Sequence, residues 1–159
     1  MKFVAASETG FSFEFNLREK QMLFRVLALY PLIPAKHHRL SRTADDDEAQ
    51  RLLDELLANH RDEARRKVKD LMSNPRHFKP SGEQFLWIAS RADMEWLLQV
   101  LNEVRVGSWL TLGRPDLQKG KTIPPSPDNF RHYWAMDVAG GFEMIFIAAL
   151  SGELPVQND

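Results

Sequence analysis

The feature that most constrains this chain is an apolar segment near its C-terminal end, from Tyr133 to Leu150. Of its eighteen residues, fourteen are apolar or aromatic, and the other four are Gly140, Gly141, Asp137 and Glu143. A membrane span needs about 20 mostly uncharged residues. Each central acid costs about 2.5–3.5 kcal/mol on insertion, whereas each strong apolar residue contributes only about 0.3–0.6 kcal/mol. The segment is therefore predicted to be a buried central helix of a soluble protein, apolar on nearly all sides, and not a membrane span.

Composition is typical of a single soluble domain. The chain has 159 residues, of which 43% are hydrophobic, no cysteine and a formal net charge of −1. A chain of this length buries roughly two thirds of its unfolded surface, so it needs no metal to fold. The lack of cysteine excludes disulfides, a thiol nucleophile and a Cys-ligated metal. We expect one domain over 1–152 and a frayed tail over 153–159. The N-terminal residues lack a signal-peptide pattern, which favours a cytoplasmic location.

Hydrophobic patterning predicts an α+β fold that is mainly helical. Strict alternation over 11–15 and a short apolar run over 3–6 predict a hairpin, with Gly10 at a positive φ. The aromatic run over 85–88 is predicted to be a third strand paired with 11–15, with a helix as the alternative. Helical periodicity predicts four helices: from Asn16 to about Tyr30, from Asp45 to about Met72, from Ser90 to about Leu112, and from Ser126 to about Leu150. We expect a four-helix core with the small antiparallel sheet on one side.

Local signals refine this outline. Asn16 and Glu19 have the spacing of a capping box at the start of the first helix. The second helix is predicted to bury one side, made of Ala49, Leu52, Leu53, Leu56, Leu57, Ala64, Val68 and Leu71. Prolines and Gly82 predict an irregular stretch over 73–82.

A long polar loop over 113–127 separates the last two helices and contains four prolines when Pro127 is counted. Loops of this length are often functional. We expect this loop and its neighbours to form an interaction surface, whose candidate residues are Trp109, Arg114, Lys119, Lys121, Phe130 and Tyr133.

Polar groups within the apolar helices are the candidates for chemistry: Asn102, Glu103, Arg105, His132, Asp137 and Glu143. A buried acid needs a cation, and Arg105 or His132 could supply it. Asp137 and Glu143 are six residues apart and point to different sides of the helix, so they cannot act as a carboxylate pair. The favoured interpretation is an ion pair that fixes helix register. The alternative is a buried polar site with shifted pKa values.

Motifs for cofactors and metals are missing from the sequence. The five histidines make no His-x-x-x-His or Glu-x-x-His pair, and the glycines make no phosphate-binding loop. We therefore expect no metal and no cofactor. Basic clusters over 36–42 and 61–79 could bind nucleic acid, but no recognition motif accompanies them and a helix C-terminus favours cations anyway. Nucleic-acid binding is therefore disfavoured.

The segment from Trp96 to Gly107 contains the run Asn102-Glu103-Val104-Arg105. It resembles the Asn–acid–aliphatic–Arg segment of a bacterial family known as the domain of unknown function numbered 2017. The order of parts is also similar: an extended start, a leucine-rich helix, a short strand, this helix and a final apolar helix with an embedded Glu, here Glu143. The resemblance implies no activity and no catalytic residues. It implies a link to protein turnover, because genes of that family often lie near a Clp-protease adaptor.

The leading functional prediction is a non-catalytic protein-interaction or regulatory module that binds a protein partner or a second copy of itself. A rigid bundle, one long loop and the lack of a catalytic constellation favour it. The alternative is an enzyme or small-ligand binder that uses a charged pocket lined by Glu103, Arg105, Asp137 and Glu143. A nucleic-acid-binding protein is the third possibility.

Overall fold

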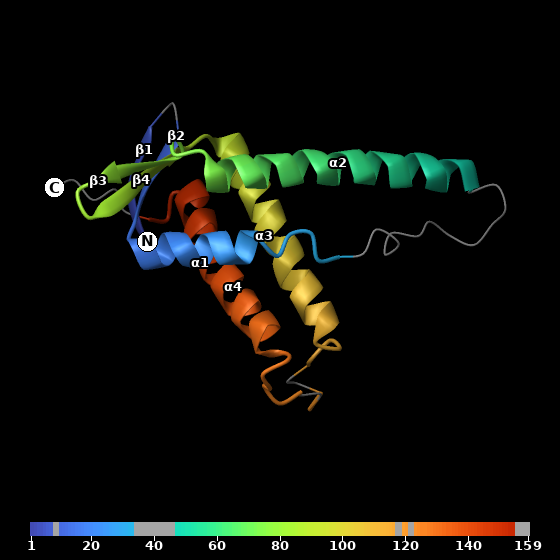
Figure 1. The fold of residues 1–159 in the computed structure, drawn as a ribbon. Helices are drawn as coiled ribbons and strands as arrows, with labels where there is room; N and C mark the ends of the chain where they lie inside the picture. Colours follow the sequence, from blue (N-terminus) through green and yellow to red (C-terminus); the bar gives the residue numbers. More distant parts are fainter. Residues whose placement is uncertain (8–9, 34–46, 117–118, 121–122, 155–159) are drawn as a thin grey trace.

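The structure, a computed structural model, describes residues 1–7, 10–33, 47–116, 119–120 and 123–154. A sheet lies beside a group of helices, and one long helix extends away from both (Figure 1). This confirms the α+β, mainly helical fold class. The elements in chain order are β1 Lys2–Ser7, β2 Gly10–Phe15, α1 Leu17–Leu27, α2 Asp47–Ser73, β3 Phe78–Ser81, β4 Gln84–Ala89, α3 Arg91–Thr111 and α4 Phe130–Ser151.

The sheet is antiparallel throughout, with strand order β1-β2-β4-β3. Phe13 of β2 lies opposite Phe3 of β1 on one side and Trp87 of β4 on the other. The predicted pairing of 85–88 with 11–15 is therefore confirmed, and the alternative helix is wrong. Alternation places Phe13 and Phe15 on the covered face, where both are fully buried.

Gly10 allows the two central strands to approach closely. Its φ is +153°, and a Cβ added there would lie 2.5 Å from the carbonyl oxygen of Ala89 on β4. No other residue fits this position without displacing the backbone. The positive φ predicted for Gly10 is confirmed.

The sheet has a fourth strand that the sequence pattern did not reveal. Residues 73–82 were expected to be irregular, but β3 pairs with β4 over four residues. Pro80 lies in β3 and weakens its strand pattern; an edge strand tolerates proline because one side of it needs no N–H donor. At the opposite edge, β1 has an irregularity between Phe3 and Ala5.

Helix α4 packs against α1, α3 and β1. Its inner face buries Ala135, Ala139, Phe142, Phe146 and Ala149. The ring of Phe146 lies edge-on to Phe13, 5.2 Å between centroids, which joins α4 to the sheet. The helix is apolar on nearly all sides, as predicted. The predicted burial is wrong for its outer face, because Met144 is 71% exposed and Ile147 is 55% exposed.

Local features of the sequence explain how α1 begins and how the chain passes α3 after α1 ends. Asn16 Oδ1 accepts from the backbone N–H of Glu19, and Glu19 accepts in return from Asn16, so the predicted capping box is confirmed. After α1 the chain crosses α3 at Gly107. A Cβ on Gly107 would lie 2.5 Å from Cβ of Leu32, so only glycine leaves room for this crossing.

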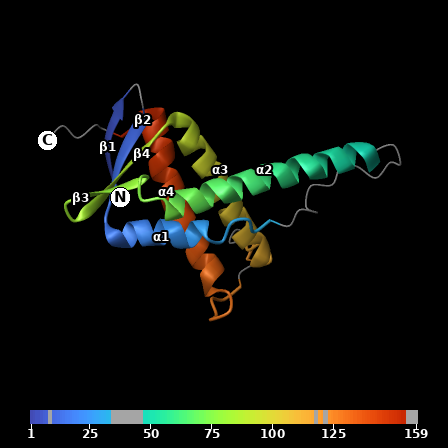
Figure 2. The same cartoon turned by 45° about the horizontal axis from the view of Figure 1, so that its top comes forward.

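Helix α2 contributes to the core only through its C-terminal part. Ala64, Val68 and Leu71 are buried, as predicted, and Lys67 Nζ binds Asp93 Oδ1 of α3 at 2.8 Å. The N-terminal part extends away from the sheet and the other helices in both views (Figures 1 and 2). The burial predicted for Leu52 and Leu56 is therefore wrong, since they are 57% and 67% exposed. The predicted start at Asp45 lies outside the described residues.

Candidate functional site

The six polar candidates do not gather at one place. Arg105 Nη1 of α3 donates to Glu143 Oε2 of α4 at 2.8 Å, and Glu143 is 5% exposed. The predicted pairing of a buried acid with Arg105 is thus confirmed for Glu143. Asp137 and Asn102 are both exposed. The predicted burial of Asp137 is wrong, because the helical turn between positions 137 and 143 places only Glu143 against α3.

Glu103 lies on another side of α3, close to Tyr30. Its Oε1 is buried and makes no hydrogen bond with any described residue. Burial raises the pKa of the Tyr30 hydroxyl, and the negative charge of Glu103 raises it further, while Arg61 and Arg65 lower it. Glu103 and Glu143 therefore occupy separate environments and share no pocket.

His132 lies at the start of α4, beside α3. Its Nδ1 is 3.4 Å from Ser108 Oγ. Burial lowers the pKa of the His132 ring, and the charge of Arg131 lowers it further. A serine next to a histidine can act as a nucleophile, but Ser108 is fully buried within α3. The contact is therefore structural, since a substrate cannot reach the hydroxyl.

The interaction surface expected around 113–127 stays a prediction, and only part of it is exposed. Phe130 is 60% exposed, and Arg114 and Lys119 are also exposed. Trp109 and Tyr133 are half-buried and hold the loop: Trp109 Nε1 donates to the carbonyl of Pro115 at 3.0 Å, and the Tyr133 hydroxyl donates to that of Ile123. Lys121 lies outside the described residues.

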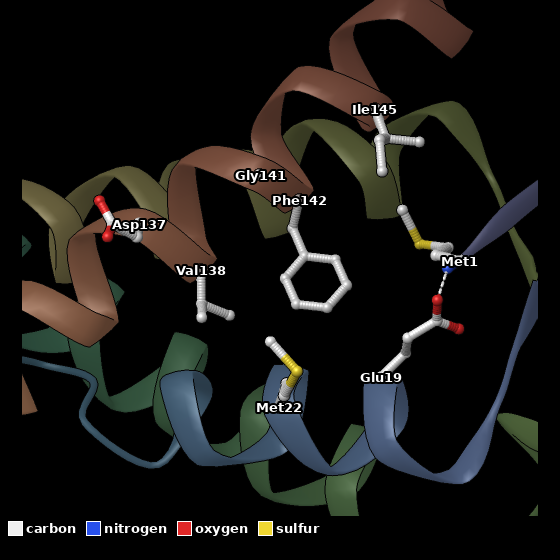
Figure 3. A pocket seen from close by; sticks show the side chains of 8 residues that line it. All are labelled: Met1, Glu19, Met22, Asp137, Val138, Gly141, Phe142 and Ile145. Atoms are coloured by element: carbon white, nitrogen blue, oxygen red, sulfur yellow. Dashed lines mark hydrogen bonds and ion pairs between the residues drawn. The ribbon is translucent and has the colours of Figure 1, made fainter.

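The structure contains a groove between α1 and α4 that the sequence did not predict. Its volume is about 320 Å³, and Figure 3 shows Phe142 at its centre, with Met22 of α1 facing Val138 of α4. We call this the α1–α4 groove; its lining residues are Met1, Glu19, Met22, Asp137, Val138, Gly141, Phe142 and Ile145. Helical spacing places Val138, Phe142 and Ile145 on one side of α4, but the crossing of α1 that completes the groove cannot be read from sequence.

The only charged side chains that line the groove are two carboxylates. Glu19 already caps α1 and binds the amino group of Met1. Asp137 makes no hydrogen bond or ion pair with any described residue. Figure 3 shows these two acids at opposite ends of the groove. The groove thus combines an apolar floor with one free negative charge.

The part of the chain that the structure describes contains no group of three or more His, Asp or Glu residues placed to hold a metal ion. The basic cluster over 36–42 lies outside that part, so its position relative to 61–79 is not described.

Helix α4 is also the one helix within the described ranges that is long and apolar enough to cross a membrane. The mean hydropathy of its most apolar window is 1.3, and 39% of that window is buried. Core helices of soluble proteins reach the same values, so the soluble, cytoplasmic location stays a prediction.

Comparison of the chain with family models, with curated proteins and with solved structures found no match. The resemblance carried by 96–107 therefore stays a prediction, and the function must be argued from the geometry.

Proposed function

We propose that this protein is a non-catalytic interaction module that binds an apolar segment of a partner protein in the α1–α4 groove. The observation that carries this proposal is the pairing of an apolar lining with Asp137, an exposed carboxylate that has no partner among the described residues. A segment that fits this groove presents an aliphatic or aromatic side chain next to a lysine or arginine.

The apolar lining supplies the affinity. Removing apolar surface from water is favourable by about 25 cal/mol per Å². Grooves between helices commonly accept an amphipathic helix, whose side chains at i, i+3 or i+4 act as anchors. Phe142 and Met22 form the floor on which such an anchor would rest.

Asp137 would determine the orientation of the bound segment in the groove. An exposed ion pair contributes only about 0–1 kcal/mol, but a charge at one end of an apolar groove selects the orientation of the bound segment. Glu19, at the other end, is engaged by its cap and by Met1. A basic residue on the partner is therefore expected at the Asp137 end.

Dispersal of the polar candidates supports the non-catalytic role. Arg105 and Glu143 neutralise each other, Glu103 lies near Tyr30, and His132 contacts a buried serine. A general acid and base must both reach the same region of a substrate, within about 3 Å of the transferred protons. The cytoplasmic location and the link to protein turnover stay predictions beside this proposal.

A peptide-display selection against the whole chain tests the proposal. We expect selected peptides to pair an apolar residue with a neighbouring Lys or Arg. Gly141→Trp, which fills the groove, should weaken their binding by at least about tenfold, which is about 1.4 kcal/mol. Asp137→Lys, which replaces an exposed ion pair with repulsion, should weaken it by a smaller factor, about threefold to tenfold. Ser151→Trp and Asp128→Lys, exposed and outside the groove, are the matched controls. Peptides that bind all four variants equally would refute the groove as the docking site.

A second candidate is a small apolar ligand, because the groove volume lies within the range of roughly 300–1,000 Å³ that ligand sites occupy. A fluorescent apolar probe that Gly141→Trp excludes, together with a peptide selection that enriches nothing, would favour this candidate over a protein partner.

A further inference from the structure

Two arginines border the α1–α4 groove on its α1 side. Arg18 and Arg25 are exposed, and neither makes a hydrogen bond or ion pair with any described residue. Together with Met22 they follow the 4-3 spacing that places side chains along one side of a helix. Because Met22 lines the groove, the two arginines lie next to its opening without belonging to its lining. We call Arg18 and Arg25 the arginine lip.

The stability of α1 explains only one of these two charges. Arg25 lies in the last turn of the helix, where the helix dipole favours a cation. Arg18 lies in the first turn, where the dipole disfavours a cation. The charge of Arg18 is therefore unfavourable for α1 itself, and it points to a contact outside this helix.

The opposite side of the groove is negative. Asp137 of α4 is exposed and has no partner among the described residues. Figure 3 shows α4 along one side of the groove and α1 along the other. A segment that lies along the groove therefore meets positive charge on its α1 flank and negative charge on its α4 flank.

Gly141 leaves space for the backbone of such a segment. It is exposed, and a Cβ added there would meet nothing within 4 Å. No described contact of this chain therefore requires glycine at this position, although glycine within a helix costs about 1 kcal/mol relative to alanine. The missing side chain lets another backbone approach α4 closely, which favours a helix over a small ligand as the occupant.

We infer that the segment bound in the α1–α4 groove is an amphipathic helix with acidic residues on one flank and a basic residue on the other. This assignment rests on the proposed function, because it specifies the partner of the same groove. The arginines of the lip are seven residues apart, about 10 Å along α1. A helix that lies along α1 matches them with acids at i and i+7, while its base pairs with Asp137 and its apolar anchors rest on Met22 and Phe142.

Two selections from a library of helical peptides test the flank charges, one against the wild-type chain and one against Arg18→Glu/Arg25→Glu. Against the wild type we expect acids at i and i+7 on one flank and a base on the other. Against the variant the acids should be replaced by Lys or Arg, while the apolar anchors and the base near Asp137 are kept. Both arginines are exposed, so circular dichroism should show that the variant still folds.

The affinity of a peptide selected on the wild type gives a second measurement, which also serves if the charge-reversed variant unfolds. Arg18→Gln/Arg25→Gln adds no acid to α1 and should weaken binding about threefold to tenfold. This loss should shrink at about 1 M salt, because exposed ion pairs are screened there. Arg51→Gln/Arg76→Gln, at exposed positions outside the groove, is the matched control and should leave the affinity unchanged.

The results distinguish this assignment from the proposed function. Peptides that depend on the groove but are the same in both selections would overturn the acidic flank and leave the groove as a docking site. Acids at the i, i+2 spacing of an extended chain would overturn the helix alone. If no selected peptide is sensitive to Gly141→Trp, both proposals fall. A dimer of the full chain that Gly141→Trp dissociates would show instead that a second copy occupies the groove.

Discussion

Arg105 on α3 and Glu143 on α4 form an ion pair, 2.8 Å from Nη1 to Oε2, in which the acid is buried and the base is half exposed. Glu143 Oε1 is also buried and makes no hydrogen bond within the described residues. The arginine thus supplies the one charge that compensates the only acid buried in the described part of the chain. This pair joins α4 to α3.

Removing Arg105 alone should therefore cost more than removing both partners. Arg105→Met leaves an uncompensated buried carboxylate, and we expect a loss of about 3 kcal/mol in the free energy of unfolding, the lower end of the usual range because the arginine is half exposed. The double variant Arg105→Met/Glu143→Met should lie within about 1 kcal/mol of the wild type. Urea unfolding of the wild type, Arg105→Met, Glu143→Met and the double variant completes this double-mutant cycle. Additive losses would show that the two side chains act independently.

Substitution by alanine should have opposite effects on stability at Gly107 of α3 and at Gly140 of α4. Gly107→Ala would place a Cβ 2.5 Å from Leu32, and we expect a loss of about 1–3 kcal/mol. Gly140→Ala meets nothing within 4 Å, and the better helix propensity of alanine should add about 1 kcal/mol. Thermal unfolding of the two variants measures both effects. A destabilised Gly140→Ala would show that another backbone approaches that face in solution.

Acid should weaken the fold through His132. Its pKa is lowered in the folded state, first by burial and then by Arg131, so the unfolded chain binds the proton more tightly. The His132 contribution is complete above the unfolded pKa of about 6.5 and is lost as the pH falls below that value. His132→Asn should therefore lose less stability than the wild type between about pH 7.5 and pH 5.

Urea unfolding at the two pH values makes this comparison. Asn59→Ala, at an exposed position on α2, changes no titratable group and is the control, so it should keep the wild-type pH dependence. Identical slopes for wild type and His132→Asn would exclude His132 as a source of acid sensitivity.

Lys67 should anchor α2 to the body. Its Nζ binds Asp93 at 2.8 Å and lies 4.4 Å from the centroid of the Trp96 ring. Burial raises the pKa of the Asp93 carboxyl, but hydrogen bonds from Lys67 and Ser90 outweigh it, and the net pKa is lowered. We expect Lys67→Met to cost about 1 kcal/mol.

Hydrogen exchange should show that this loss is concentrated in α2, with α3 and α4 keeping their protection. Lys69→Met, exposed on the same helix, is the control. Equal loss of protection in all helices would mean that Lys67 does not act as a local anchor.

Local signals in the sequence predicted the elements well, because each depends on nearby residues. The capping box of Asn16 and Glu19, the alternation over 11–15 and the end of α4 near Leu150 all depend on short-range signals. Strand β3 was not predicted from the sequence, because Pro80 breaks the pattern of a strand that is only four residues long. A strand that short is defined by its partner β4 and not by its own residues.

Burial was predicted less well, because it depends on where helices cross. The stripe from Ala49 to Leu71 is one continuous pattern, yet the body covers only its last part. Asp137 and Glu143 stand in equally apolar surroundings in the sequence, and only the position of α3 decides that Glu143 is buried. The α1–α4 groove has the same origin, since Met22 and Phe142 are far apart in the chain and meet only through the helix crossing.

Both edges of the sheet discourage the addition of a foreign strand. On β3, Pro80 removes a backbone donor and Lys79 adds a charge, while on β1 the irregularity between Phe3 and Ala5 interrupts the regular row of backbone groups. Proteins that recruit others by extending a sheet need a long, regular, unoccupied edge. The sheet of this molecule is therefore protected against edge-to-edge aggregation.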